Sequence, residues 1–181
     1  MTIFQLLRDD HHRLRLILEN LIETTSRSIE PHTTQPSLES GRRWLGELEM
    51  VHLAHSRAEE LVLYERLRFL PHRDGLADQQ LEEHRMIEET LDELAQMDPT
   101  DDKWDEALSL VKNQLESHLA SEETTVFPIL ELAVEQEEAE RLARDFEISR
   151  DDILAHVRAQ RKTAPLRAPF VFSGKFSPPR R

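Results

Sequence analysis

The sequence predicts an all-α protein: an antiparallel up-down-up-down four-helix bundle with an additional C-terminal helix and a flexible tail. Three observations support this prediction. Among 181 residues only four are glycine, 6% are aromatic and 33% are charged, a composition typical of helices rather than sheets. Apolar residues recur at spacings of three and four along most of the chain. The breaks between these periodic segments are short, which favours antiparallel neighbours.

The first two predicted helices are separated by a proline-containing break. Apolar residues follow one helical face from about Thr2 to Ser28, which predicts the first helix. The break IEPHTTQPS comes next, and its last residue, Ser37, is a suitable N-cap for the second helix. We expect the second helix to run to about Leu70, where the sequence PHRDG is a stop signal.

Two further helices complete the predicted bundle, and a fifth follows it. The third runs from about Leu76 to Met97 and ends at the turn DPTDD. The fourth begins near Asp102, and we expect it to kink or end at Pro128, because proline lacks a backbone N–H. The fifth, from about residue 134 to 161, is charged almost all round apart from a thin apolar stripe.

The chain is therefore expected to have three parts: the bundle at residues 1–132, the additional helix at 133–162 and the tail at 163–181. The tail contains four prolines, four basic residues and no acid, so we predict that it is disordered. The alternative is a docking segment that binds a protein partner, or the acidic body of this chain, through Phe170, Phe172 and Phe176.

The composition excludes several functional classes. A formal net charge of −13 argues against a nucleic-acid partner and against attraction to an anionic membrane. The absence of cysteine excludes disulfides, thiolate metal sites and cysteine nucleophiles. The sequence has no apolar signal core and no apolar run long enough to span a bilayer. We therefore expect a soluble, cytoplasmic protein.

Three histidines are each followed four residues later by a glutamate, and each pair lies on a different predicted helix. Residues four apart share a helix face. Each pair lies on the apolar stripe of its helix rather than on the charged face, and the first helix carries a further histidine on its own stripe. The pairs are His55–Glu59, His84–Glu88 and His118–Glu122, and the further histidine is His11. In a bundle these side chains would point at one region of the core.

This set of side chains predicts a metal site. A buried carboxylate costs several kcal/mol unless it is paired, and no lysine or arginine lies on the same stripes at that level. Nitrogen and oxygen donors without sulfur favour iron or manganese, with zinc as an alternative. Seven donors exceed what one ion takes. Two six-coordinate ions, bridged by two glutamates and a hydroxide, would use all seven and leave about one position open, at zero net charge.

The same residues occur in motifs that resemble a known family. DHHRL at 10–14, HSRAEE at 55–60, EHRMIEE at 83–89 and HLASEETTVFP at 118–128 are similar, in this order, to the motifs of the hemerythrin-like, HHE cation-binding domain. The resemblance covers roughly residues 1–132. It implies a non-haem di-iron centre with a bridging oxo or hydroxo group in a four-helix bundle. Such a centre binds, senses or reacts with dioxygen, or with another small diatomic or peroxide ligand, at an open metal position.

The resemblance also implies which residues bind the metals, and which two of them bridge the two ions. The implied ligands are His11, His55, Glu59, His84, Glu88, His118 and Glu122, with Glu59 and Glu122 as the bridges. Oxygen-carrying members have a second histidine in the third helix where this chain has Glu88. We therefore expect sensing, iron handling or slow reduction of oxygen or peroxide rather than oxygen transport, and a metal- and oxygen-binding protein rather than a dedicated enzyme.

Several assignments stay open at this point. Glu123 could replace Glu122 as a bridge, because five residues also turn most of the way round a helix. His52 is either a supporting residue of the site or part of the core. We expect Tyr64 and Phe127 to pack below the metals rather than to touch them.

Two other functions compete with the di-iron oxygen-binding hypothesis. One is a metal-occupancy sensor or iron-handling interaction module without turnover. The other is a ferritin-like di-metal carboxylate oxidase. That fold needs the pattern Glu-x-x-His in two helices, and this sequence has it once, at Glu49–His52.

Overall fold

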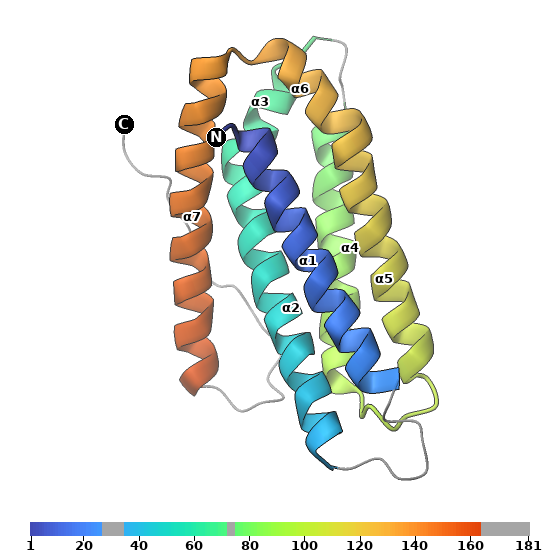
Figure 1. Ribbon diagram of the computed structural model, residues 1–181. Helices are drawn as coiled ribbons and strands as arrows, with labels where there is room; N and C mark the ends of the chain where they lie inside the picture. Colours follow the sequence, from blue (N-terminus) through green and yellow to red (C-terminus); the bar gives the residue numbers. More distant parts are fainter. Residues whose placement is uncertain (27–34, 72–74, 164–181) are drawn as a thin grey trace.

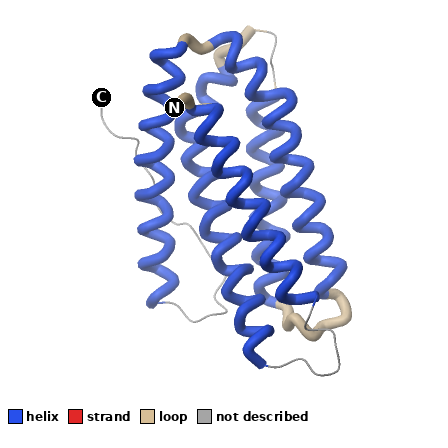
Figure 2. Tube along the Cα trace, in the orientation of Figure 1, coloured by secondary structure: helices blue, strands red, loops and turns tan. Residues whose placement is uncertain are grey.

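The computed structural model describes residues 1–26, 35–71 and 75–163, and every regular element in these ranges is helical (Figure 1; Figure 2). Four long helices form a bundle in which α1 lies beside α2, α2 beside α4, α4 beside α5 and α5 beside α1. These helices are α1 (Ile3–Ser26), α2 (Gln35–Val62), α4 (Leu76–Gln96) and α5 (Trp104–Ser121). Figure 1 shows α1 and α4 running in one direction and α2 and α5 in the other. The predicted fold class is confirmed.

A fifth long helix, α7 (Gln136–Thr163), packs on the outside of the bundle against α1 and α2. It corresponds to the additional helix that the sequence predicts, and its apolar stripe contributes Leu142, Phe146, Ile153 and Val157 to the core. Residues 164–181, on which the predictions of disorder and docking fall, lie outside the described residues.

Some predicted boundaries differ from the observed ones. α2 begins at Gln35, so Ser37 lies inside the helix and is not its N-cap. α5 begins at Trp104 rather than Asp102 because Asp98 and Asp101 accept backbone hydrogen bonds in the turn before it. The predicted end of the first helix and the stop signal PHRDG fall partly on residues 27–34 and 72–74, which are not described.

Two helices are interrupted near the same end of the bundle. α2 ends at Val62, and after Leu63 the chain continues as α3 (Tyr64–Arg68). α5 passes into a π-helical turn, η2 (Glu122–Val126), and then into α6 (Phe127–Ala133). We expected a kink or an end at Pro128; the irregular turn instead precedes this proline, and the helix continues beyond it.

The apolar core is divided into two clusters with polar residues between them. On α1, Leu7 belongs to the cluster nearer α3 and α6, and Leu14 belongs to the cluster at the other end. His11 lies between these two leucines. On α5 and η2, Leu115 and Val126 belong to opposite clusters in the same way. The polar residues therefore occupy one level of the bundle, closed by apolar packing above and below.

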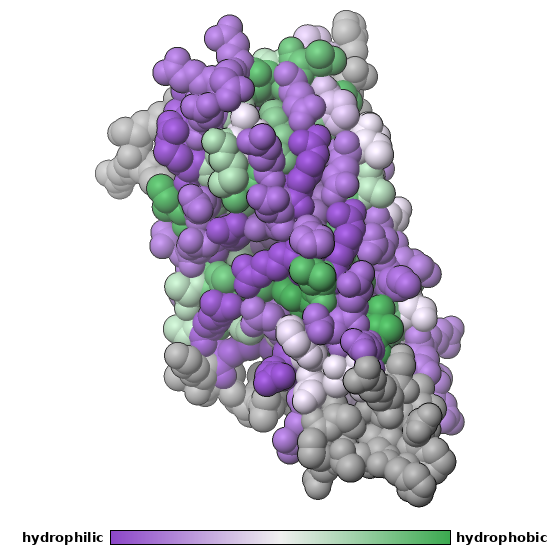
Figure 3. Space-filling model, viewed as in Figure 1, coloured by the Kyte–Doolittle hydropathy of each residue, from purple (hydrophilic) through white to green (hydrophobic). Residues whose placement is uncertain are grey.

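The face shown in Figure 3 is mainly hydrophilic, with separate hydrophobic areas. None of the helices in the described ranges is both long enough and apolar enough to cross a membrane.

Candidate metal centre

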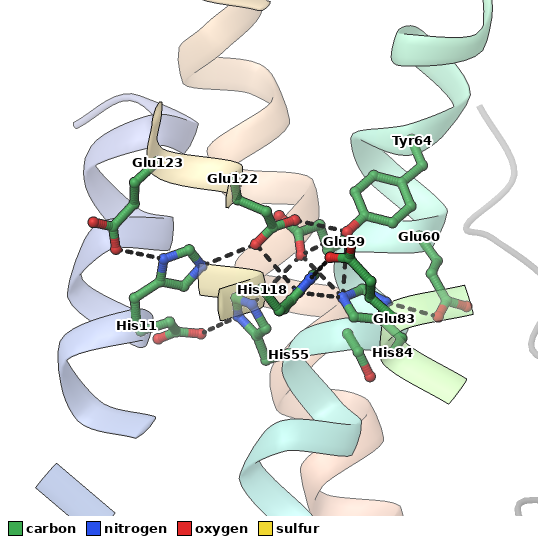
Figure 4. A network of polar contacts seen from close by, with 12 residues as sticks. His11, His55, Glu59, Glu60, Tyr64, Glu83, His84, His118, Glu122 and Glu123 are labelled. Carbon is green, nitrogen blue, oxygen red and sulfur yellow. Dashed lines mark hydrogen bonds and ion pairs between the residues drawn. The ribbon is translucent and has the colours of Figure 1, made fainter. Parts of the chain in front are cut away.

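Six of the seven predicted ligands converge at the level between the two core clusters (Figure 4). They come from all four bundle helices and η2, and none is more than 1% exposed. Their donor atoms form two overlapping groups, each within 4.8 Å, and Glu122 belongs to both. The first group is Glu59, His84, His118 and Glu122, and the second is His11, His55 and Glu122.

Each of the four histidines points its Nε2 atom inward, towards a glutamate. Glu122 Oε2 lies 3.2 Å from Nε2 of His11 and 3.5 Å from Nε2 of His118. Glu59 Oε2 lies 3.4 Å from Nε2 of His55 and 3.7 Å from Nε2 of His84. The two glutamates therefore each contact histidines of both groups, as bridging ligands would.

Each histidine also points its Nδ1 atom outward, towards another carboxylate. Nδ1 of His11 lies 2.8 Å from Glu123, Nδ1 of His84 lies 3.1 Å from Glu60, and Nδ1 of His118 lies 3.0 Å from Glu83. Nδ1 of His55 lies 3.6 Å from Asp10, too long for a hydrogen bond. A carboxylate that accepts from Nδ1–H fixes the ring and leaves the Nε2 lone pair free, the arrangement found behind metal-bound histidines.

These outer carboxylates have a signal in the sequence that our prediction missed. Each one is the direct neighbour of an inner residue, so doublets of one supporting carboxylate and one inner residue recur along the chain. The doublets are Asp10–His11, Glu59–Glu60, Glu83–His84 and Glu122–Glu123. One member of each doublet faces the centre, and the other supports a histidine of a neighbouring helix. Glu122 is fully buried and Glu123 is 28% exposed, so the structure places Glu122 inside and Glu123 in the supporting position.

The buried carboxyl groups do not ionise alike. Burial, together with the charge of Glu122, raises the pKa of Glu59 well above its ordinary value. Burial would also raise the pKa of Glu122, but the nearby His118 and His11 outweigh it and lower this pKa. Burial, assisted by His118, holds the pKa of His84 well below its ordinary value. At His118, Glu122 and Glu83 outweigh burial and raise the pKa. The centre is thus a group of inward histidine nitrogens around one carboxylate charge, a set of donor atoms that a cation would satisfy.

Tyr64 reaches into the centre, contrary to our expectation that it would only pack below it. Its hydroxyl donates a 2.7 Å hydrogen bond to Glu122 Oε1 and lies 3.2 Å from Nε2 of His84. The break at Leu63 precedes this tyrosine directly. Burial and the charge of Glu122 raise the Tyr64 pKa well above its ordinary value, so the phenol keeps its proton and acts as a donor.

Phe127 belongs to the same apolar cluster as Tyr64 and packs against the His11 side of the centre, as expected. Its ring stacks on His11 with 5.4 Å between centroids. Phe127 follows His118 by nine residues. In an uninterrupted α-helix this is about two and a half turns, so the Phe127 ring would point away from the face that carries His118. The π-helical turn, in which the Phe127 N–H donates to the Glu122 carbonyl, accommodates one additional residue and changes that direction.

Glu88, the seventh predicted ligand, is not brought to the centre. Arg57 donates to it at 2.8 Å and Ser56 lies 3.4 Å away. Its side chain is 23% exposed, and burial of the carboxyl raises its pKa to about 7. We had expected Glu88 to bind the metal in place of the second histidine that oxygen-carrying members have in this helix. The structure gives no support to that expectation.

Another polar side chain on α4 is buried instead. Gln80 lies one turn before His84 and is 0% exposed, and neither atom of its amide has a partner among residues 1–26, 35–71 and 75–163. His52 on α2 is similarly buried, and its ring meets that of His84 edge-on at 6.0 Å.

α7 supports the side of the centre that contains His55. Arg150 of α7 donates to Asp10 at 2.7 Å, and Asp10 is the carboxylate that faces His55. Phe146 of α7 meets the His55 ring edge-on at 5.9 Å, and the Arg150 guanidinium lies over the Phe146 ring. The contact with His55 and the charge of Arg150 together outweigh burial and lower the pKa of Asp10, which keeps it ionised.

The sequence matches the hemerythrin HHE cation binding domain family over residues 2–130. It is 26% identical to an uncharacterized hemerythrin-like protein of Schizosaccharomyces pombe, over 94% of this chain and 78% of that protein. It is 22% identical to a DNA nickase of Nostoc sp., over 88% of this chain but 42% of that protein. No solved structure gives a significant match. α7 lies beyond the residues that match the family.

Proposed function

Because this chain belongs to the hemerythrin HHE cation-binding family, we propose that its buried centre binds two iron ions and that the ions bind, sense or react with dioxygen or peroxide. The observation that carries the proposal is the convergence of four inward Nε2 atoms on two shared glutamates in a space closed to solvent. When bound, the ions supply an open coordination position and redox chemistry that the side chains lack.

The proposed ligands are the six converging residues, without Glu88. His11 and His55 would hold one ion, and His84 and His118 the other. Glu59 and Glu122, which contact histidines of both groups, would lie between the ions. Nitrogen and oxygen donors of this kind also suit manganese and zinc, so the identity of the metal is part of the proposal.

The surrounding residues orient these ligands and exclude water. Glu123, Glu60 and Glu83 hold three of the rings from behind, so that their Nε2 atoms stay available. The Tyr64 hydroxyl donates to Glu122 Oε1 and leaves Oε2 directed at the histidines. The apolar clusters on both sides keep the centre at low dielectric, which strengthens every charge interaction inside it.

A metal-occupancy sensor or iron-handling module is supported by the same observation. Inward lone pairs and carboxylates without a cation oppose folding, so binding of metal would stabilise the bundle and loss of metal would loosen it. The ferritin-like oxidase is not favoured, because Glu49 pairs with Arg161 and lies away from the centre. The net charge of −13 gives no support to a DNA partner of the kind that the name of the Nostoc relative indicates.

Metal analysis of protein produced in iron-rich medium tests the proposal. We expect about two iron ions per chain, with near-ultraviolet absorption from ferric iron that changes when the reduced protein meets dioxygen or peroxide. A stably folded, metal-free protein that takes up no iron would contradict the proposal. Iron binding without any spectral response to either oxidant would favour the iron-handling module instead.

A further inference from the structure

A cavity of about 220 Å³ lies beside the centre, between α2, α4 and α7. Its wall combines apolar side chains, such as Met50 and Val157, with the polar side chains of His52, Arg57, Glu88 and Arg161. At about 30 Å³ for each water molecule, the volume suits a few small molecules rather than a large organic cofactor. One wall belongs to α7, which lies outside the residues that match the family.

His52 lies at the inner wall of this cavity. Its ring is 1% exposed, and neither nitrogen has a hydrogen-bond partner within the described ranges 1–26, 35–71 and 75–163. The same ring meets His84 edge-on at 6.0 Å, so it separates the cavity from the His84 side of the centre. An imidazole ring can donate and accept a hydrogen bond, and leaving both unmade in a buried place is costly. A small molecule with both a donor and an acceptor would satisfy it.

A chain of polar contacts links the cavity to the same histidine. Nδ1 of His84 contacts Glu60 at 3.1 Å, and Glu60 accepts from Arg57 at 2.7 Å. The other nitrogen of the Arg57 guanidinium donates to Glu88 at 2.8 Å. Arg57 and Glu88 both line the cavity. Glu88, which the sequence assigned to the metal, thus belongs to the wall of the neighbouring space.

The lining favours a small neutral molecule. Three carboxyl groups face the cavity, those of Glu49, Glu88 and Asp92, and they oppose anions. The two guanidinium groups are already engaged, because Arg57 pairs with Glu88 and Arg161 pairs with Glu49. Dioxygen, which donates no hydrogen bond, gains nothing from His52. Hydrogen peroxide has two donors, two acceptors and a size close to that of water.

We infer that this cavity admits small neutral hydrogen-bonding molecules, with hydrogen peroxide as the relevant oxidant, to the His84 side of the centre. The inference rests on the proposed function for the role of the centre, but the occupancy of the cavity can be tested without any metal. His52 is the inner hydrogen-bonding residue, and α7 supplies the outer wall.

Met50 provides a chemical probe of entry into the cavity. When hydrogen peroxide attacks the thioether, one oxygen atom bonds to sulfur, the O–O bond breaks and water leaves, so that sulfur loses two electrons and peroxide gains them. Met50 lines the cavity, whereas Met86 is 39% exposed and serves as an internal reference. Mass spectrometry of metal-free protein treated with hydrogen peroxide measures sulfoxide at both residues.

Filling the cavity should protect Met50. In Val157→Phe, which places a ring at the cavity wall, we expect the ratio of Met50 to Met86 oxidation to fall about fivefold or more. Leu91→Phe fills the same space from α4 and replaces the first variant if that one does not fold. Leu110→Phe, on an exposed part of α5, is the control and should leave the ratio unchanged. An unchanged ratio in the folded cavity variant, or equal protection in the control, would overturn the inference.

A second measurement tests whether the cavity leads to the centre. In reduced, iron-loaded protein we expect Val157→Phe and His52→Leu to slow oxidation by hydrogen peroxide about tenfold, and oxidation by dioxygen less than about twofold. If the variants slow oxidation by both oxidants equally, or do not slow oxidation by peroxide, the cavity is not the route of peroxide to the centre. This holds even if Met50 is protected. A chain that takes up no iron would contradict the proposed function, while the Met50 readout would still decide whether the cavity admits peroxide.

Discussion

The two halves of the centre use the same kinds of ligand but are supported in different ways. In the His84 and His118 half, both rings receive a carboxylate at 3.0–3.1 Å, and Tyr64 adds a hydroxyl. In the His11 and His55 half, His11 contacts Glu123 at 2.8 Å, but Nδ1 of His55 lies 3.6 Å from Asp10, and Asp10 is itself held by Arg150 of α7. The first half is therefore complete within the bundle, whereas the second depends on a helix beyond the family match. We expect the two metal positions to differ in affinity for this reason.

Substitution of Glu122, the residue common to both halves, should have the largest effect. Glu122→Gln keeps the size of the side chain but removes the charge that faces His11 and His118. We expect both positions to lose affinity by more than about 100-fold, measured by cobalt(II) titration and metal analysis. Glu123→Gln, at the adjacent supporting position, is the matched control and should affect mainly the His11 half. Retention of two ions by Glu122→Gln would show that this residue is not shared.

Arg150→Ala should separate the two halves. Without the guanidinium, Asp10 is less firmly held behind His55, so we expect the affinity of one of the two metal positions to fall about 10- to 100-fold. Cobalt(II) titration followed by absorption should then show one strong and one weakened phase. Arg150→Lys keeps the charge and should recover part of the loss.

Arg158→Ala is the control on the same helix. Arg158 also forms an ion pair with α2, through Glu47 at 3.0 Å, but the pair is exposed and distant from the centre. We expect a change below about twofold in either phase. Equal weakening of both positions by Arg150→Ala, or the same effect in Arg158→Ala, would mean that α7 stabilises the fold without positioning the His55 half.

The sequence predicted six inner residues correctly because their helical spacing could be read directly. The same spacing wrongly placed Glu88 among them. On α2 and α5, which run in the same direction, a glutamate four residues after a histidine lies about 6 Å further towards α3 and α6. On α4, which runs the opposite way, the same step moves Glu88 about 6 Å towards the other end of the bundle. The residue level with Glu59 and Glu122 is then Gln80, four before His84.

The supporting interactions were hidden from the sequence for a different reason. Carboxylates such as Glu60 and Glu83 serve histidines of neighbouring helices, so their partners depend on how the helices are rotated against each other. The contact of Tyr64 depends on a break in α2 that no proline or glycine marks. Local spacing fixes which residues share a face, whereas these contacts are decided by tertiary packing.

The pH dependence should distinguish the two shared glutamates. The pKa of Glu59 is raised in the folded, metal-free protein. Above pH 4.5, the ordinary pKa of the group, the folded protein therefore still holds a proton that the unfolded chain has lost. The free energy of unfolding should therefore fall as pH rises above 4.5, and metal affinity should rise by about tenfold per pH unit for each proton displaced. The pKa of Glu122 is lowered, so its contribution is present above 4.5 and is lost as pH falls below it.

Glu59→Gln tests this assignment. Because burial also raises the pKa of Glu88, the decrease in stability above pH 4.5 that the metal-free wild type shows in urea unfolding should become smaller in the variant, while the loss at lower pH remains. An identical pH profile in both proteins would assign the retained proton to another group.

The smallest expected effects come from a matched pair on α4, four residues on either side of His84. Gln80→Leu removes a fully buried amide at the level of the shared glutamates, and Glu88→Gln removes a half-buried carboxyl in the cavity wall. We expect Gln80→Leu to change the affinity of the His84 and His118 half about threefold to tenfold, and Glu88→Gln to change it less than about twofold. The same cobalt(II) titration measures both. The reverse order would restore Glu88 as a ligand, and it would require α4 to be rotated from the orientation in which His84 faces Tyr64 and His118.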